Sequence, residues 1–141
     1  MKKQLVILPL VIFATLFQSK AVKPITGTWL MTKSILNGRL YPNDGHSYKR
    51  INPKGTFTNF SKDLSMETPL MKGKYFVAND SVYSEWVIND KSQNQEDNIN
   101  TFIYTLKGDT LILKGSYFVA LDLNRGIYGK VKMEQSWVKA E

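Results

Sequence analysis

The sequence predicts an all-β fold, an eight-stranded antiparallel up-and-down β-barrel preceded by a helical signal peptide. From Gly27 onwards apolar and polar residues alternate with period two, and turn residues interrupt the alternation roughly every eight to twelve residues. No convincing amphipathic helix follows the leader. Trp29 and Trp137 stand near the two ends of the alternating region, which suits a sheet whose first and last strands are neighbours. A two-sheet sandwich is the alternative that strand number leaves open.

The first 21 residues have the pattern of a secretory signal peptide. Lys2 and Lys3 form a positive start, and Leu5–Phe17 is an uncharged, mostly apolar stretch of 13 residues. Small residues at Ser19 and Ala21 suit a cleavage site. A helix of that length reaches only about 20 Å, short of the ~30 Å hydrocarbon core of a bilayer. We therefore expect residues 1–21 to be removed and residues 22–141 to form one exported domain, periplasmic or secreted, with no membrane span in the mature chain.

Composition narrows the class of protein further. The chain has no cysteine, which excludes disulfides and a lipid-anchored cysteine. Its formal net charge is +7, but three of the 19 basic residues lie in the leader and none of the 12 acidic residues does, so the mature chain carries +4. The remaining lysines are scattered among strands and turns, as on the solvated outer face of a barrel. We predict no nucleic-acid partner.

The first strand begins at about Thr28 and ends at Leu36, where Asn37-Gly38 is a turn. After a second turn at Pro42–Gly45, a short strand is predicted over Ser47–Ile51. Asn52-Pro53-Lys54-Gly55 is a strong hairpin signal, because proline presets φ and glycine accepts a positive φ.

The central strands follow the same logic. The third strand covers Thr56–Phe60, and Ser61–Pro69 is interpreted as a polar connection. Met71–Val77 alternates clearly, and Asn79-Asp80 turns the chain into Ser81–Ile88. Asn89–Asn98 has no apolar residue and is predicted to be an exposed loop.

The last three strands are predicted over Ile99–Leu106, Thr110–Ala120 and Tyr128–Lys139. Lys107-Gly108-Asp109 forms a tight hairpin between the first two, and Asp122–Gly126 turns the chain into the last. Eight strands is the number at which a meander closes around side chains or around one small ligand.

Several short segments resemble the small, exported, lipocalin-like (calycin) bacterial proteins grouped as a domain of unknown function. They occur in order along essentially all of the mature chain: Gly27-Thr28-Trp29, Gly73-Lys74-Tyr75, Tyr83-Ser84-Glu85, Phe102-Ile103-Tyr104, Gly108-Asp109-Thr110-Leu111 and Trp137-Val138-Lys139. The resemblance implies a β-barrel that usually has a pocket for a hydrophobic ligand, with no established activity. Lys139 stands where lipocalins place a late arginine against the first-strand tryptophan. The chain is also shorter than lipocalins and lacks their disulfides.

The alternation also predicts which side chains point into the barrel. The ligand-binding candidates are Lys33, Tyr75, Tyr83, Glu85, Phe102, Tyr104 and Gln135. Aromatic walls with a few polar groups are typical of a small-molecule site, and a packed core with satisfied tyrosines is the alternative. A buried Glu85 requires a partner, for which Lys33 is the hypothesis. Trp29, Trp137 and Lys139 are predicted to be structural, with the lysine lying across an indole.

We predict no catalytic residue, no metal site and no cofactor. The chain has a single histidine, His46, which is interpreted as an exposed turn residue. The first hypothesis for the function is an exported barrel that binds a small, partly apolar ligand without covalent change. The alternative is a ligand-free envelope module that contacts a protein or glycan through the loops Asn37–His46, Ser61–Pro69 and Asn89–Asn98. The sequence leaves the oligomeric state open.

Overall fold

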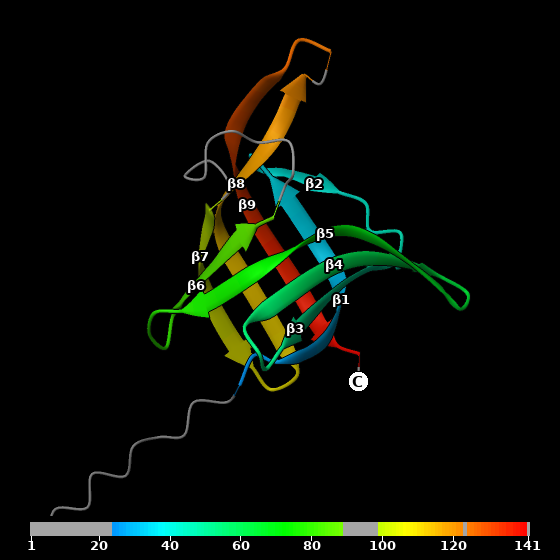
Figure 1. Ribbon diagram of the computed structural model, residues 1–141, viewed down its shortest axis with the longest axis vertical. Coiled ribbons are helices and arrows are strands. Elements are labelled where there is room, and N and C mark those ends of the chain that lie inside the picture. Colours follow the sequence, from blue (N-terminus) through cyan, green and yellow to red (C-terminus); the bar gives the residue numbers. More distant parts are fainter. Residues whose placement is uncertain (1–23, 89–98, 123, 141) are drawn as a thin grey trace, which may run out of the picture.

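The computed structural model describes residues 24–88, 99–122 and 124–140 (Figure 1). These residues form nine strands: β1 (Gly27–Leu36), β2 (Arg39–Tyr41), β3 (Ser47–Asn52), β4 (Thr56–Asp63), β5 (Met66–Val77), β6 (Val82–Val87), β7 (Ile99–Lys107), β8 (Thr110–Asp122) and β9 (Ile127–Lys139). No helix among the described residues is long and apolar enough to cross a membrane. The predicted signal peptide and the predicted loop Asn89–Asn98 lie outside the described residues.

The strands form one antiparallel sheet in the order β2-β1-β3-β4-β5-β6-β7-β8-β9, and an additional pairing of β1 with β9 closes it. The three-residue β2 pairs only with β1, so the closed barrel has eight strands in up-and-down order. Figure 1 shows β1 beside the red β9 along the seam. The predicted fold class is confirmed, and the sandwich alternative is wrong because one continuous sheet runs round the molecule.

The seam joins the two ends of the chain over most of β1. Trp29 is opposite Lys139, Met31 is opposite Trp137, and Leu36 is opposite Met133. The register shifts between Met31 and Lys33, where one extra residue on β1 forms a bulge. The other edge of β1 is shared, because Gly27–Leu30 pairs with β3 whereas Ser34–Leu36 pairs with β2.

The predicted polar connection Ser61–Pro69 is wrong, because most of it is strand. β4 runs to Asp63 and β5 starts at Met66, so the two form a long hairpin. The register shift between Asn59 and Phe60 places Pro69 opposite Phe60 at a bulge, where a missing N–H is tolerated. Both faces of the distal part of this hairpin are largely exposed, so its sequence needs no apolar alternation.

The strand β2 was not predicted. Asn37 and Gly38 both have positive φ, 48° and 79°, which is the backbone of a type I′ hairpin turn. The turn was therefore recognised, but the three residues after it are exposed on both faces and show no alternation. Pairing with β1 alone makes them a strand.

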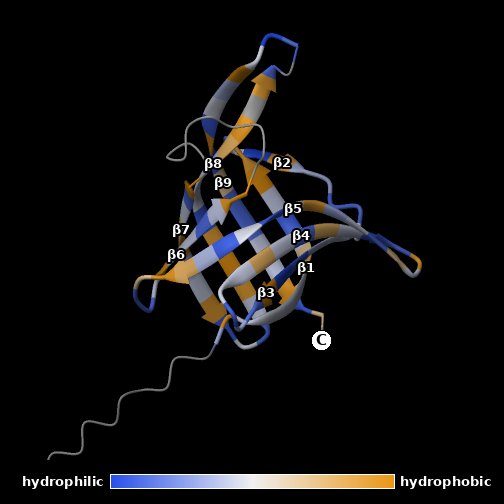
Figure 2. Cartoon of the chain, in the orientation of Figure 1, coloured by the Kyte–Doolittle hydropathy of each residue, from blue (hydrophilic) through white to orange (hydrophobic). Residues whose placement is uncertain are grey.

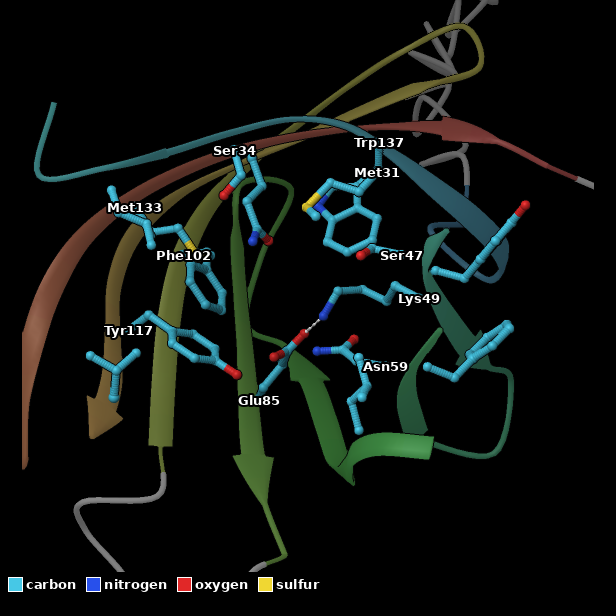
Figure 3. Close-up of a pocket in the computed structure, with 16 residues that line it drawn as sticks. Met31, Ser34, Ser47, Lys49, Asn59, Glu85, Phe102, Tyr117, Met133 and Trp137 are labelled. Atoms are coloured by element: carbon cyan, nitrogen blue, oxygen red, sulfur yellow. Dashed lines mark hydrogen bonds and ion pairs between the residues drawn. The ribbon is translucent and has the colours of Figure 1, made fainter. Parts of the chain in front are cut away.

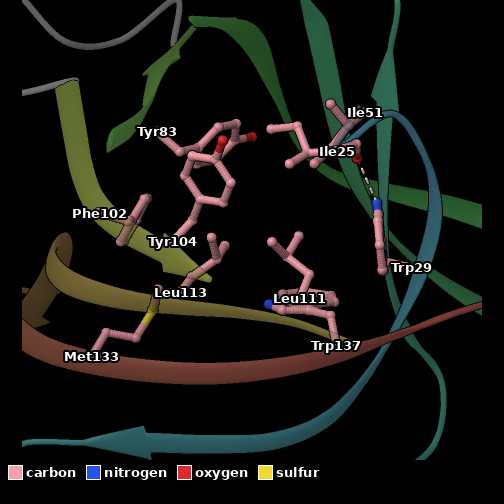
Figure 4. Packing of buried hydrophobic residues seen from close by; sticks show 10 residues of the cluster. All are labelled: Ile25, Trp29, Ile51, Tyr83, Phe102, Tyr104, Leu111, Leu113, Met133 and Trp137. Atoms are coloured by element: carbon pink, nitrogen blue, oxygen red, sulfur yellow. Dashed lines mark hydrogen bonds between the residues drawn. The ribbon is translucent and has the colours of Figure 1, made fainter. Parts of the chain in front are cut away.

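The core lies inside the barrel and toward the end where the chain enters and leaves it (Figure 4). Its buried residues come from the segment before β1 and from six barrel strands, β1, β3, β6, β7, β8 and β9: Ile25, Trp29, Ile51, Tyr83, Phe102, Tyr104, Leu111, Leu113, Met133 and Trp137. In Figure 2 the strands of the wall alternate between apolar and polar colours, and the β4–β5 hairpin has an apolar tip. The packed core thus fills one part of the interior, and the candidate site lies in the other part.

Candidate functional site

A cavity of about 210 Å³ lies inside the barrel beside the packed core. Its lining includes four of the predicted site residues, which are Glu85 of β6, Phe102 of β7 and Gln135 and Trp137 of β9. The other lining residues come from β1, β3, β4, β5, β8 and β9: Met31, Ser34, Leu36, Ser47, Tyr48, Lys49, Asn59, Phe60, Leu70, Tyr117, Val119 and Met133. The inward direction predicted for the last strands is therefore confirmed at these positions.

The three predicted tyrosines, Tyr75, Tyr83 and Tyr104, are not among the residues that line the cavity, so their predicted inward positions belong to the core instead. Tyr83 and Tyr104 are buried in the core, and Tyr75 packs against it from β5. The Tyr83 ring is 5.7 Å from the Tyr75 ring and 6.2 Å from the Phe102 ring, centroid to centroid. Tyr75 donates a hydrogen bond to the backbone oxygen of Asn52 at 2.9 Å. These rings support the wall of the site.

Lys33 does not face the interior. Its side chain is about half exposed, with Nζ 3.9 Å from a carboxylate oxygen of Glu134. The bulge after Met31 moves the inward position from Lys33 to Ser34, which is buried and lines the cavity. Period-two counting cannot detect an extra residue in one strand, so the prediction of Lys33 as the partner of Glu85 is wrong.

The partner of Glu85 is Lys49 of β3 (Figure 3). The Lys49 ammonium donates to Glu85 Oε1, and the Tyr83 hydroxyl donates to the same oxygen at 2.8 Å. Lys49 Nζ also lies 5.0 Å from the ring centroid of Phe57 and 5.4 Å from that of Trp137. Lys49 and Glu85 are 2% and 0% exposed, so this ion pair is a buried part of the cavity wall.

Sequence reasoning placed Lys49 on the solvated outer face. One feature of the sequence could have predicted that Lys49 points inward: it lies two residues before Ile51, so the two side chains share one face of β3, and that face is buried. That feature is ambiguous, because Tyr48 places an aromatic side chain on the other face of the same strand, and either face could be the inner one. Only the pairing of β3 with β1 and β4 decides which face is inside.

Three buried polar atoms in the described part of the protein have no hydrogen-bond partner within it. They are Asn59 Oδ1, Glu85 Oε2 and Trp137 Nε1, and all three residues line the cavity. Figure 3 shows these side chains with Lys49 on one side of the cavity. A buried polar atom without a partner costs about 1–3 kcal/mol, and more when it is charged. Because all three atoms belong to side chains that line one cavity, they mark the polar side of a site.

The buried tyrosines near this polar side are held in the neutral form. Burial, and next the negative charge of Glu85, raise the pKa of Tyr83 well above its ordinary value of 10.0. The same two causes raise the pKa of Tyr117, which donates its hydroxyl to the thioether of Met71 at 2.7 Å. At neutral pH both hydroxyls are therefore hydrogen-bond donors that carry no charge.

The two tryptophans of the seam differ in environment. Trp29 Nε1 donates to the backbone oxygen of Ile25 at 2.8 Å, and Lys139 Nζ lies 4.5 Å from the Trp29 ring centroid. The predicted lysine–indole contact thus involves Trp29. Trp137 belongs both to the core and to the cavity wall, and its indole N–H has no partner among the residues that the structure describes.

The predicted exposed turn residue His46 is exposed, between β2 and β3, and its Nδ1 is 2.9 Å from the backbone oxygen of Lys62. Within the described residues, no three histidine, cysteine, aspartate or glutamate side chains are grouped so as to hold a metal ion. In chemical terms the site offers a neutralised ion pair, donors and acceptors at one side, and apolar walls elsewhere.

The fold and the cavity define the class as a small closed antiparallel β-barrel domain. The chain belongs to the family described as "Domain of unknown function (DUF4488)", whose model matches residues 24–141. No curated protein matches the chain. The family match covers the whole barrel together with the segment that enters it.

Proposed function

We propose that this protein is an exported, lipocalin-like barrel that binds a small, partly apolar molecule non-covalently in its cavity. The observation that carries the proposal is the set of three buried polar atoms that have no partner among the described residues, on side chains that line one cavity. A solid core would have satisfied those atoms or replaced them with apolar groups. Apolar walls with a few convergent polar groups are the usual construction of a small-molecule site.

The size of the cavity limits the ligand. At about 210 Å³ it lies below the ~300–1,000 Å³ that is usual for drug-sized molecules. Leu70 lines the cavity and is also 64% exposed, so it marks the rim. The ligand is therefore compact, or inserts one end and leaves the rest at the rim near Leu70.

Native mass spectrometry of protein purified from the cells that make it tests the proposal. We expect a co-purified small-molecule adduct on the wild type. Ser34→Phe, which fills the cavity from β1, should abolish the adduct, whereas Thr105→Phe on the exposed face of β7 should keep it. A wild type without an adduct that also fails to bind an apolar fluorescent probe would contradict the proposal.

A second candidate function is an envelope module that contacts a partner through its hairpins. The β4–β5 hairpin favours it, because Leu64 and Met66 at its tip are 94% and 68% exposed. Exposed apolar clusters of this kind are typical of interaction sites. A Leu64→Ser/Met66→Ser variant that loses a cross-linked partner in cells but keeps the small-molecule adduct would assign the hairpin to this second role.

A further inference from the structure

We infer that the cavity selects a neutral head group that both donates and accepts hydrogen bonds, such as a hydroxyl or a primary amide on an apolar body, against carboxylates and amines. The inference rests on the proposed function and specifies its ligand class. It follows from four side chains, Lys49, Asn59, Glu85 and Trp137, which we call the polar pole of the cavity.

Glu85 supplies a fixed acceptor. Its Oε1 accepts hydrogen bonds from Lys49 and Tyr83, whereas its Oε2 is buried without a partner in residues 24–88, 99–122 and 124–140. An ionised carboxylate accepts hydrogen bonds and cannot donate them. A ligand that stabilises this oxygen must therefore carry an O–H or N–H group.

Trp137 supplies a fixed donor. The indole Nε1–H can only donate, it is buried without a partner in the described part of the chain, and its ring lines the same cavity. The Asn59 amide adapts to either need, because its Nδ2 has only a 3.9 Å contact with the thioether of Met71 and a half-turn of the amide exchanges oxygen and nitrogen. The polar pole is therefore satisfied best by a head group that both donates and accepts hydrogen bonds.

Charge then excludes ionised ligands. Lys49 and Glu85 neutralise each other and are almost fully buried, so the polar pole has no net charge to offer a ligand ion. A carboxylate head would place a second negative charge beside Glu85 Oε2, and an ammonium head would lie near Lys49. Like charges brought together at a buried site repel each other and weaken binding. A neutral hydroxyl or amide meets the donors and acceptors without this repulsion.

The test is a titration with four ligands that share one chain and differ in the head group: 1-octanol, octanamide, octanoate and octylamine. The readout is the indole N–H resonances of the protein's three tryptophans in a proton–nitrogen correlation spectrum. We expect octanol and octanamide to shift the Trp137 resonance. The Trp29 resonance is the internal control, because its N–H is already bonded to Ile25. Octanoate and octylamine should bind at least about tenfold more weakly.

A charge variant sharpens the test. Glu85→Gln leaves Lys49 unopposed, so the order of preference should reverse and octanoate should bind more tightly than octanol. Glu134→Gln removes an acid on the outer face and should leave the wild-type order unchanged. The wild-type series decides the question by itself if Glu85→Gln does not fold.

Two results would overturn the inference. One is octanoate or octylamine binding to the wild type as tightly as octanol. The other is an unchanged Trp137 resonance with all four ligands. If the native adduct is still present on the wild type and absent from Ser34→Phe, either result removes only the head-group inference and leaves the proposed function in place. Loss of the native adduct as well removes both.

Discussion

Glu85 and Lys49 are tolerated inside the barrel because each is the partner of the other. Taking a charged group out of water is costly, and the attraction between the two charges offsets this cost only when both are present. The Tyr83 hydroxyl adds a third group to the same carboxylate oxygen at 2.8 Å. The Lys49–Glu85 pair thus determines the polarity of this side of the cavity.

Lys49→Met should lower the free energy of unfolding by about 3–5 kcal/mol, because it leaves a buried carboxylate without its partner. Urea unfolding followed by tryptophan fluorescence measures the loss. Arg50→Met, which removes an ion pair to Glu67 on the exposed face of the same strand, is the control and should have a much smaller effect. Equal losses for the two variants would show that the buried pair has no special role.

The free energy of unfolding should fall as the pH rises above about 10. Unfolded tyrosines lose their protons near that pH, whereas the folded barrel keeps Tyr83 and Tyr117 protonated because their pKa values are raised. The stability that depends on these two neutral hydroxyls is fully present below the tyrosine pKa of the unfolded state. It is lost as the pH rises toward the raised tyrosine pKa of the folded state.

Tyr83→Phe removes one of these groups, so its stability should fall less steeply with alkaline pH than that of the wild type. Urea unfolding at a series of pH values measures both slopes, and the two curves should run parallel at neutral pH. A wild-type stability that stays flat above pH 10 would contradict the assignment.

Within the sheet, glycines determine how closely an aromatic ring or the backbone of one strand can approach the next strand. Gly115 of β8 is opposite Phe102 of β7, and a Cβ at Gly115 would lie 2.9 Å from the Phe102 ring and would clash with the backbone oxygen of Thr101. The aromatic ring covers the glycine from the inside of the barrel. The backbone of β7 and the Phe102 ring can therefore approach β8 this closely only with glycine at this position.

Gly115→Ala should destabilise the barrel by about 3 kcal/mol or more, because the new methyl group meets backbone atoms that cannot move aside. Gly129→Ala in β9 is the control: its Cβ would meet only the flexible end of the exposed Leu121 side chain, and the cost should stay below about 1 kcal/mol. Thermal unfolding monitored by circular dichroism compares the two. Equal melting temperatures would contradict the close-approach argument.

Strand prediction from sequence succeeded where one face of a strand is buried. β7 alternates between exposed and buried positions over most of its length, and its predicted bounds, Ile99–Leu106, differ from the observed strand by one residue. It failed over Ser61–Pro69 because the β4–β5 hairpin extends into solvent, where neither face imposes a pattern. The site prediction failed at Lys33 for another reason, the bulge, which leaves no trace in residue types.

Closure is the feature of the whole molecule on which the cavity depends. β9 pairs with β8 along its full length and with β1 across the seam, so one strand joins the end of the meander to its beginning. Trp29 lies near one end of the seam, 1% exposed, where it packs with the segment that enters the barrel. This end of the seam therefore depends on the segment before β1 and on the last residues of β9, which both contact Trp29.

Trp29→Ala should lower the free energy of unfolding by about 3–5 kcal/mol, as truncations of core tryptophans do. The loss includes the contact of Lys139 with the indole ring. Trp86→Ala on β6 is the matched control, since that side chain is 38% exposed, and it should cost far less. Guanidinium unfolding measures both, and a Trp29 variant as stable as the Trp86 variant would contradict the role of Trp29 in closing the barrel.

Residue types alone were enough to predict the all-β class and most of the turns, because period-two alternation and turn chemistry are local properties of the chain. The positions of Trp29 and Trp137 near the two ends of the alternating region also predicted that their strands pair. Only the tertiary structure decided that Lys49 is the partner of Glu85 and that Asn59, Glu85 and Trp137 surround one cavity. These residues lie on strands far apart in the sequence, and the register of a closed sheet, including its bulges, determines which of their side chains meet.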